Sequence, residues 1–309
     1  MFPLWQSEKG NAEKYEAIGS SREERKKGGR VIKTVKIYSK NAAYQKFGVL
    51  KTNRNKRHRY GEFFVEGVRN INEAEKNGWR FSSFLYSSER SLSGWAKEKL
   101  ASVKTDVNYE LAGGLMEELS EKQDTSELLA VVRMREDSVS QLRMSENPLL
   151  VLFDRSSNHG NLGTIIRSCD SLGVDGLILT GHGVDLYDPA VVTASMGSFF
   201  HVPVIRMADT AAVLSFFSRM REKYSGFQLV GTTAHNETRL SDVDFCKPTL
   251  VMIGNETEGL CRAFKEQSDI LATIPMSGTS SASSFNVACA ATVILYEAVR
   301  QRLSSPKDL

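Results

Sequence analysis

Three loops in the sequence combine polar side chains in patterns that could hold a ligand and act on it. The first is NHGNLGTIIR, residues 158–167, which follows the apolar run LLVLFD. The second is GNETEGL, residues 254–260, and the third is SGTSSASSFN, residues 277–286; each also follows an apolar run. In parallel α/β sheets, ligands bind beyond the carboxyl ends of the strands. We therefore expect the three loops to lie together and form one site.

The first loop offers a cation close to the start of a helix. Asn161 and Arg167 are six residues apart, about 1.7 helical turns, so the long arginine side chain can reach back toward the helix N-terminus. A guanidinium there could bind phosphate or polarise a hydroxyl group. The alternative is a solvent-facing arginine on an amphipathic helix, because its neighbours Ile165 and Ile166 are apolar.

The other two loops suit ligands of different chemistry. Gly254 and Gly259 bracket a turn that carries Glu256 and Glu258, and these carboxylates could simply stabilise the start of the next helix. They would repel phosphate, and the loop lacks the phosphate-binding Gly-x-x-x-x-Gly-Lys pattern. The third loop carries no charge in a protein that is 25% charged. Its hydroxyls and open backbone suit a neutral ligand edge such as adenine or ribose, and the apolar elements on both sides argue against a flexible linker.

Composition indicates a cytoplasmic, globular protein. The 309 residues are enough for two ordinary domains, and no apolar run approaches the ~20 residues of a membrane span. The first residues, MFPLWQSEKG, carry charges where a signal peptide would be apolar. The cysteines form no Cys-x-x-Cys pair, so we expect reduced thiols and neither disulfides nor a metal site; they are Cys169, Cys246, Cys261 and Cys289.

Positive charge is concentrated at the N-terminus. Residues 1–60 hold 16 Lys and Arg against five Glu, so the remaining chain carries a net charge of −8. This asymmetry predicts a polyanionic partner such as RNA, and the alternative is a solvated tail. The basic residues that we expect to bind RNA in the run KTNRNKRHRYG are Arg54, Lys56, Arg57 and Arg59.

The hydrophobic pattern predicts a basic extension over 1–45, an α/β domain over 46–140 and a second α/β domain over 141–309. In the first domain we expect helices between strands at 62–68, 80–88, 106–112 and 127–134, arranged in three layers. In the second domain we expect a parallel sheet of about six strands, at 148–154, 174–181, 201–207, 227–234, 248–256 and 270–276. Its helices are expected at 161–173, 189–200, 210–226 and from 286 onward. No strand is followed by Gly-x-Gly-x-x-Gly, which disfavours a nicotinamide-dependent dehydrogenase.

Taken together, in their order and spacing, the three loops resemble the three motifs of the SpoU/TrmH family of RNA ribose 2′-O-methyltransferases, within the SPOUT class. The matching segments are NHGNLGTIIRSCDSLGVDGLIL, LVMIGNETEGL and IPMSGTSSASSFNVACAATVILYEAVRQR, in the correct order over 148–302. Upstream, RHRYGEFFVEGVRNINEA and LMEELSEKQDTSELLAVV resemble the family's L7Ae/L30e-like substrate-binding domain.

The resemblance implies an S-adenosylmethionine enzyme with a C-terminal trefoil knot, acting as a homodimer. By motif position, the catalytic residues would be Asn161, Arg167, Glu256, Ser284 and Asn286. The cofactor would contact Thr232, Thr233, Ala234, Gly254, Asn255, Gly259, Ile274, Met276, Ser284 and Phe285. The sequence departs from the family at Phe285, where leucine is usual, at Thr193, where a basic residue is common, and in a third loop about two residues longer.

The implied chemistry fits these residues. A ribose 2′-hydroxyl is a poor nucleophile near neutral pH, so methyl transfer needs placement and help with proton loss. We expect Arg167 to bind the neighbouring phosphate and lower the pKa of the hydroxyl; a role as the base itself suits a guanidinium less. Ribosomal RNA is favoured over transfer RNA as substrate. The other class left open is an RNA-binding protein without turnover.

Overall fold

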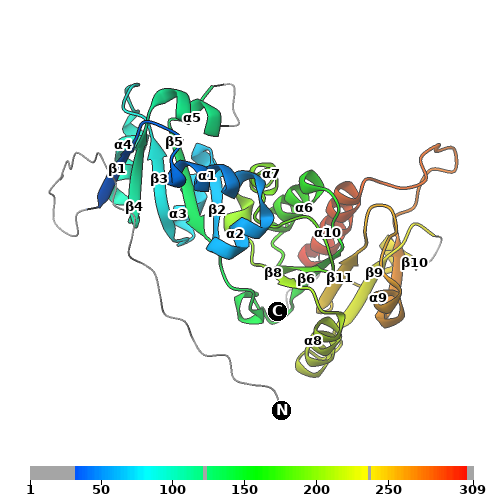
Figure 1. The fold of residues 1–309 in the computed structure, drawn as a ribbon. Helices are drawn as coiled ribbons and strands as arrows, with labels where there is room; N and C mark the ends of the chain where they lie inside the picture. Colours follow the sequence, from blue (N-terminus) through cyan, green and yellow to red (C-terminus); the bar gives the residue numbers. More distant parts are fainter. Residues whose placement is uncertain (1–31, 121–123, 236–237, 305–309) are drawn as a thin grey trace, which may run out of the picture.

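The protein consists of two α/β units packed against each other (Figure 1). The computed structural model describes residues 32–120, 124–235 and 238–304. Residues 1–31, most of the expected basic extension, lie outside this described part. None of the described helices combines the length and apolar character needed to cross a membrane.

The N-terminal unit is a five-stranded mixed sheet with helices on both faces. Its elements are β1 (Lys33–Ile37), α1 (Ala42–Thr52), α2 (Arg54–Tyr60), β2 (Glu62–Glu66), α3 (Val68–Lys76), β3 (Phe81–Tyr86), α4 (Gly94–Ser102), β4 (Val107–Leu111), α5 (Gly113–Leu119) and β5 (Leu128–Arg133). The strand order is β1-β4-β3-β5-β2, and β5 runs antiparallel to both of its neighbours. Helices α1 and α5 pack on one face, and α3 and α4 pack on the other. The expected three-layer arrangement is therefore present.

The first strand corrects the predicted extent of the basic extension. β1 pairs in parallel with β4, residue by residue from Lys33 opposite Val107 to Ile37 opposite Leu111. Ile37 is buried in the core under α1 and α5. Residues 33–45 therefore belong to the N-terminal unit. The lysines of this charged segment, Lys33 and Lys36, are tolerated because β1 is an edge strand.

The C-terminal unit is a seven-stranded parallel sheet. Its elements are η1 (Val139–Gln141), β6 (Leu149–Asp154), α6 (His159–Ser171), β7 (Gly176–Thr180), α7 (Pro189–Ala194), η2 (Ser198–Phe200), β8 (Val204–Met207), α8 (Thr210–Lys223), β9 (Gln228–Thr232), β10 (Thr238–Arg239), η3 (Leu240–Asp242), β11 (Thr249–Ile253), α9 (Arg262–Gln267), β12 (Ile270–Thr273) and α10 (Val287–Ser304). The strand order is β10-β12-β9-β11-β6-β7-β8. The six strands expected from sequence are present, and the two-residue β10 adds the seventh.

Helices cover both faces of this sheet, as continuous apolar strands require. Helices α6, α7 and α10 pack on one face, and α8 and α9 pack on the other. The helix expected over 189–200 is interrupted. Met196 and Gly197 both have positive φ, 53° and 95°, so α7 ends at Ala194 and a 3-10 turn follows from Ser198.

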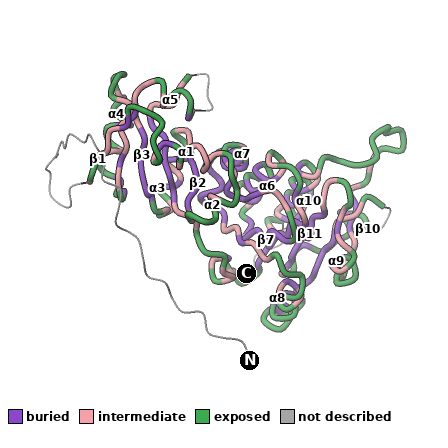
Figure 2. Tube along the Cα trace, in the orientation of Figure 1, coloured by how far each residue is buried: buried purple, intermediate pink, exposed green. Residues whose placement is uncertain are grey.

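A continuous apolar core joins the two units. Phe63 and Trp79 of the N-terminal unit pack against Phe199 and Phe200, with ring centroids 5.4 to 6.3 Å apart. The indole nitrogen of Trp79 also donates a hydrogen bond of 2.9 Å to the carbonyl of Phe200. Purple, buried segments accordingly run through both sheets in Figure 2.

Candidate active site at the carboxyl ends of the parallel strands

The three predicted loops leave neighbouring parts of the sheet. β11 lies between β6 and β9, and β12 lies on the other side of β9. All these strands are parallel, so the segments that follow Asp154, Thr232, Ile253 and Thr273 emerge at one edge. The expectation that the loops share one edge is met by this topology.

Glu256 of the second loop is held by residues of the first. Its Oε2 accepts hydrogen bonds from the hydroxyl and the backbone N–H of Ser157, at 2.5 and 3.2 Å, and its Oε1 accepts one from Nδ2 of Asn161 at 3.2 Å. Burial alone would raise the pKa of Glu256, but these hydrogen bonds, led by that of the Ser157 hydroxyl, lower the pKa below its ordinary value. Glu256 is therefore a carboxylate at neutral pH.

Asn286 connects the third loop to the same group. Its Nδ2 donates to Oδ1 of Asn161 at 3.2 Å, while its own Oδ1 accepts hydrogen bonds from the backbone N–H groups of Ala288 and Cys289 at the start of α10. Asn286 thus caps α10 and orients Asn161 at once. We call the chain Ser157–Glu256–Asn161–Asn286 the polar network; it joins all three motifs.

The second loop is fixed by Arg155, which sequence reasoning missed. Its guanidinium donates to Oδ2 of Asp154 at 3.0 Å and to the carbonyl of Gly259 at 2.9 Å, and it also pairs with Glu258. Its carbonyl accepts a hydrogen bond of 2.7 Å from Asn255. Arg155 has a φ of 52°, and a strained residue at a strand end is a signal that only the structure reveals. Ser157 was missed as well, because one serine among several carries no distinguishing pattern.

Gly254 is required by close backbone packing. A Cβ atom on this residue would lie 2.0 Å from the backbone nitrogen of Leu260 and 2.2 Å from the carbonyl carbon of Gly259. Asn255 and Gly259 also form an isolated antiparallel bridge. The second loop is therefore a closed, tight turn whose backbone is fixed before any ligand binds.

Three of the predicted residues stand apart from the polar network. Arg167 is exposed on α6 and makes no hydrogen bond or ion pair with any described residue. Ser284 and Phe285 lie in the exposed segment 277–286, which Figure 1 draws in orange extending away from the sheet. Phe285 is 45% exposed. The structure therefore brings together Asn161, Glu256 and Asn286 but leaves Arg167, Ser284 and Phe285 in solvent.

The other residues expected at a cofactor lie at the ends of β9 and β12. Thr232 is half-buried, and its hydroxyl donates to the carbonyl of Met252 at 3.0 Å. The backbone N–H of Thr233 donates to the carbonyl of Ala272 at 3.0 Å. Ile274 and Met276 are half-buried, and Ala234 is exposed. Small, hydroxyl-bearing and apolar side chains beside open backbone groups fit the neutral face of a nucleoside better than they fit a metal ion or phosphate.

One predicted RNA contact is wrong. Arg57 is only 2% exposed, because its guanidinium is buried against Asp185 at 2.7 Å and Asp188 at 2.8 Å, both in the C-terminal unit. Arg54 and Arg59 are exposed, Lys56 is half-buried, and Arg54 also donates to the carbonyl of Gly183 at 2.8 Å. Composition cannot distinguish one buried arginine within a basic run from its exposed neighbours.

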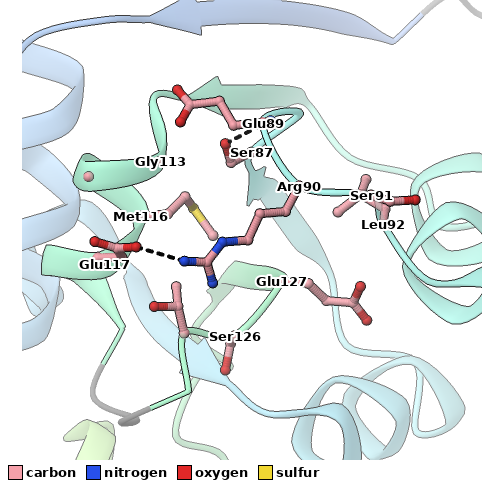
Figure 3. A pocket seen from close by; sticks show the side chains of 12 residues that line it. Ser87, Glu89, Arg90, Ser91, Leu92, Gly113, Met116, Glu117, Ser126 and Glu127 are labelled. Carbon is pink, nitrogen blue, oxygen red and sulfur yellow. Dashed lines mark hydrogen bonds and ion pairs between the residues drawn. The ribbon is translucent and has the colours of Figure 1, made fainter.

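A cavity of about 230 Å³ lies elsewhere, in the N-terminal unit. Figure 3 shows Arg90 extending across it to Glu117, whose Oε1 accepts a hydrogen bond of 3.0 Å. Met116 and Leu92 contribute apolar surface. None of the residues predicted for catalysis or cofactor binding lines this cavity.

Comparisons with known proteins agree with this geometry. Residues 148–296 match the SpoU rRNA Methylase family, and residues 41–130 match the SpoU L30e-like domain. The chain is 45% identical over 281 residues to a 23S rRNA (uridine(2479)-2′-O)-methyltransferase of Streptomyces viridochromogenes, covering 91% of this chain and 97% of that protein.

Solved structures with both units are also similar. The SpoU methyltransferase AviRb from Streptomyces viridochromogenes, in complex with the cofactor AdoMet, superimposes with a TM-score of 0.81 at 45% identity, over 86% of this chain and 99% of that one. An AdoMet-bound rRNA methyltransferase from Sinorhizobium meliloti gives 0.75 at 26% identity, over 88% and 99%. The resemblance seen in the three loops is confirmed, and the chain belongs to the SpoU rRNA methylase family.

Proposed function

We propose that this protein transfers a methyl group from S-adenosylmethionine to a ribose 2′-hydroxyl of 23S ribosomal RNA. The observation that carries the proposal is the polar network, which joins one residue from each family motif by hydrogen bonds of 3.2 Å between Glu256, Asn161 and Asn286. Support for the substrate comes from the relative that covers nearly the whole chain, whose name specifies 23S rRNA.

The cofactor would be held by the edge formed after β9, β11 and β12. We assign Thr232, Gly254, Ile274 and Met276 to its binding, together with Thr233, Ala234, Asn255, Gly259, Ser284 and Phe285. When bound, S-adenosylmethionine supplies an electrophilic methyl group. The fixed backbone of the second loop needs no reorganisation on binding, which limits the entropy lost there.

Arg167 is the residue that we assign to the RNA at the reacting ribose. Its guanidinium has no partner within the described chain, so it is available for a phosphate of the substrate. A cation beside the ribose favours loss of the 2′-hydroxyl proton to solvent as the new oxygen–carbon bond forms. Arg167 thus acts by charge, and no step requires a guanidinium to lose its own proton.

The polar network positions residues and does not supply a base. The lowered pKa of Glu256 makes it a weak proton acceptor, since efficient general bases have pKa values near the working pH. Its role is to fix the amide of Asn161, which in turn fixes Asn286 at the start of α10. Ser284 precedes Asn286 by two residues, so we propose that it joins the site when segment 277–286 closes over the cofactor.

We further propose a homodimer formed through α10, with the trefoil knot implied by the family. Val293, Tyr296 and Leu303 are 39%, 60% and 81% exposed, and their i, i+3, i+10 spacing places them along one side of the helix. An apolar stripe of this kind on an exposed helix marks an interface. A second copy of the same stripe is its proposed occupant.

The N-terminal unit would bind the RNA outside the target nucleotide, through Arg54, Lys56 and Arg59. We retain 46–140 and 141–309 as the substrate-binding and methyltransferase domains, with residues 33–45 added to the former because β1 belongs to its sheet. Residues 1–31 would add positive charge that attracts RNA.

The proposal is tested with labelled S-adenosylmethionine and separately purified 23S rRNA, 16S rRNA and transfer RNA. We expect label in 23S rRNA alone, and loss of that label with Asn161→Ala. Label confined to transfer RNA would support the alternative substrate. RNA binding without label in any fraction would identify a binding protein that lacks turnover.

A further inference from the structure

An exposed arginine of the N-terminal unit, Arg69, lies beside the C-terminal unit without a polar partner among the described residues. Arg69, in the first turn of α3, is exposed and forms no hydrogen bond or ion pair with any residue in the described ranges. Its Cγ lies 3.4 Å from the position that a Cβ on Gly197 would occupy. Glu73 of the same helix also approaches Gly197, but its carboxylate contacts Asn77 and Lys76.

Helix α6, which carries Arg167, packs against the same segment. Gly163, Arg167 and Asp170 share one face of α6, because they are four and three residues apart. A Cβ on Gly163 would lie 2.5 Å from the Cβ of Ala194, and Asp170 is hydrogen-bonded to His201. Arg167 lies between these two positions along the helix, so this part of α6 runs beside residues 194–201.

Met196 immediately precedes Gly197, the residue that Arg69 approaches. It is one of only two non-glycine residues with positive φ in the described chain, and the other, Arg155, holds the second loop of the site. Its side chain is 43% exposed, so burial does not explain why this strained position carries a large apolar residue. Strain kept without a packing reason points to a function on the surface.

We infer that Arg69, Met196 and Arg167 form one RNA-binding surface, in which Arg69 is a second phosphate anchor contributed by the N-terminal unit. This inference rests on the proposed function. Arg167 holds the phosphate beside the target ribose, Met196 packs against the adjacent nucleotide, and Arg69 holds a phosphate further along the same strand. Two guanidinium groups that lack a described partner, near an exposed apolar side chain, suit an RNA strand, which alternates phosphates with flat apolar bases.

The position of Arg69 makes it a positioning residue and not a catalytic one. The continuous core between the units holds α3 against the turn at Gly197, so Arg69 stands at a fixed place relative to Arg167. A strand that satisfies both arginines is held at two points, which restricts the ribose presented to the cofactor edge. Loss of Arg69 should therefore weaken RNA binding without altering cofactor binding or the chemical step.

The test compares Arg69→Ala with Arg219→Ala, using full-length protein and 23S rRNA transcribed in vitro. Arg219 is a matched control because it is exposed on α8 and also lacks a described polar partner. We expect Arg69→Ala to raise KM for RNA roughly tenfold and to reduce the slope of log KM against log salt by about 0.9, the share of one phosphate contact. Arg219→Ala should change neither quantity, and kcat and the Kd for S-adenosylmethionine should stay at wild-type values in both. Arg69→Lys should restore most of the affinity.

Equal KM values and salt slopes for Arg69→Ala and wild type would overturn the inference, as would an equal effect of Arg219→Ala. Equilibrium binding of the same RNA separates this inference from the proposed function. If the wild type binds the RNA but transfers no methyl group, the proposed function fails, while selective loss of binding in Arg69→Ala still supports the anchor.

A second variant tests Met196. Met196→Gly removes the apolar side chain and relieves the positive φ, so we expect an equal or higher Tm together with a KM for RNA raised several-fold. A lower Tm with unchanged KM would show that Met196 serves the fold and would contradict its place in this surface.

Discussion

At the scale of single residues, the site contains side chains that hold one another in place and a side chain that is available to contact the substrate. Glu256 of the second loop is hydrogen-bonded to the first: one carboxylate oxygen accepts from Ser157 and the other accepts from Asn161. Arg167, by contrast, has no described partner in the protein. Groups whose partners are already present keep their geometry without a ligand, whereas an unpaired exposed cation is available to bind one.

Replacing Glu256 with glutamine tests the positioning role. The amide keeps the shape but loses the charge that strengthens the hydrogen bonds from Ser157 and Asn161, which costs about 1 kcal/mol for each bond, the difference between charged and neutral hydrogen bonds. We expect kcat to fall roughly ten- to hundredfold, with little change in the Kd for S-adenosylmethionine. Glu258→Gln is the control, because among the described residues the carboxylate of Glu258 pairs with Arg155 alone and takes no part in the polar network. Equal activity of both variants would contradict a role for the network.

Replacing Arg167 with alanine tests the assignment to the substrate. We expect kcat/KM for RNA to fall by about 100-fold or more, as for loss of a charge-assisted contact made in the transition state. Thermal stability should be unchanged, since the side chain is exposed and unpaired within the described residues. Arg167→Lys should recover part of the activity, because it keeps the charge without the bidentate geometry. Turnover near that of wild type in Arg167→Ala would refute the assignment.

At the scale of elements, helix starts and strand ends create the site. Asn158 caps α6 through a hydrogen bond of 2.9 Å from the N–H of Asn161, and Asn286 caps α10. The cap of α6 binds the backbone of Asn161, and the cap of α10 is Asn286 itself. The hydrogen bonds that start the two helices therefore also place two residues of the polar network. The tight turn after β11 adds the third member of the network.

Variants of Asn286 separate its role as the cap of α10 from its hydrogen bond to Asn161. Asn286→Asp keeps an oxygen that caps α10 but removes the amide that donates to Asn161, so we expect normal stability and reduced kcat. Asn286→Ala removes both, and the free energy of unfolding should also fall by about 1 kcal/mol. Urea titration and turnover measurements distinguish the two variants. Full activity in Asn286→Asp would show that the contact with Asn161 is dispensable.

Most elements could be predicted from the sequence, and the exceptions have physical reasons. Apolar runs such as LLVLFD and TLVMI are strands buried on both faces, as their patterns indicate. β1 was missed because its two lysines, Lys33 and Lys36, fit an edge strand as well as a charged tail. The break after α7 depends on the conformation of Met196, which no periodicity reveals. The motif residues were identified by resemblance, but which of them touch each other depends on packing between strands far apart in sequence.

At the scale of the whole molecule, a buried charge cluster joins the two units. Arg57 bridges Asp185 and Asp188, and His58 lies 3.0 Å from Asp185. Burial would raise the pKa of Asp185, but the hydrogen bond and charge of Arg57 outweigh it and lower the pKa below its ordinary value. The relative position of the N-terminal unit and the site therefore depends on ion pairs as well as on the aromatic core.

Removing Arg57 should destabilise the protein strongly. Arg57→Ala leaves the Asp185 carboxylate buried without its partner, which costs about 3–5 kcal/mol in comparable buried pairs. Because the pKa of Asp185 is lowered by folding, its contribution is complete above the unfolded pKa of about 3.9 and is lost as pH falls through the folded value. The difference between wild type and Arg57→Ala in urea titrations should be large at pH 7 and should shrink below about pH 4. A difference that does not vary with pH would contradict this account.

The proposed dimer is tested on the exposed stripe of α10. Tyr296→Glu places a charge in the centre of the stripe, where pairing with a second copy would bury it uncompensated. We expect sedimentation to show a dimer for wild type and a monomer for the variant, with unfolding of each monomer little affected. Arg262→Glu on α9, where the side chain is 90% exposed, is a control that introduces the same glutamate away from the stripe and should leave the dimer intact.

The proposed activity is tested most directly by the chemical position of the transferred methyl group. 23S rRNA transcribed in vitro is incubated with the protein and labelled S-adenosylmethionine, digested to nucleosides, and the labelled nucleoside is identified by mass spectrometry. We expect a single nucleoside with the methyl group on the ribose, at a position where the RNA backbone resists alkaline cleavage, and far less label with Arg167→Ala. A methyl group on the base would contradict the proposed activity.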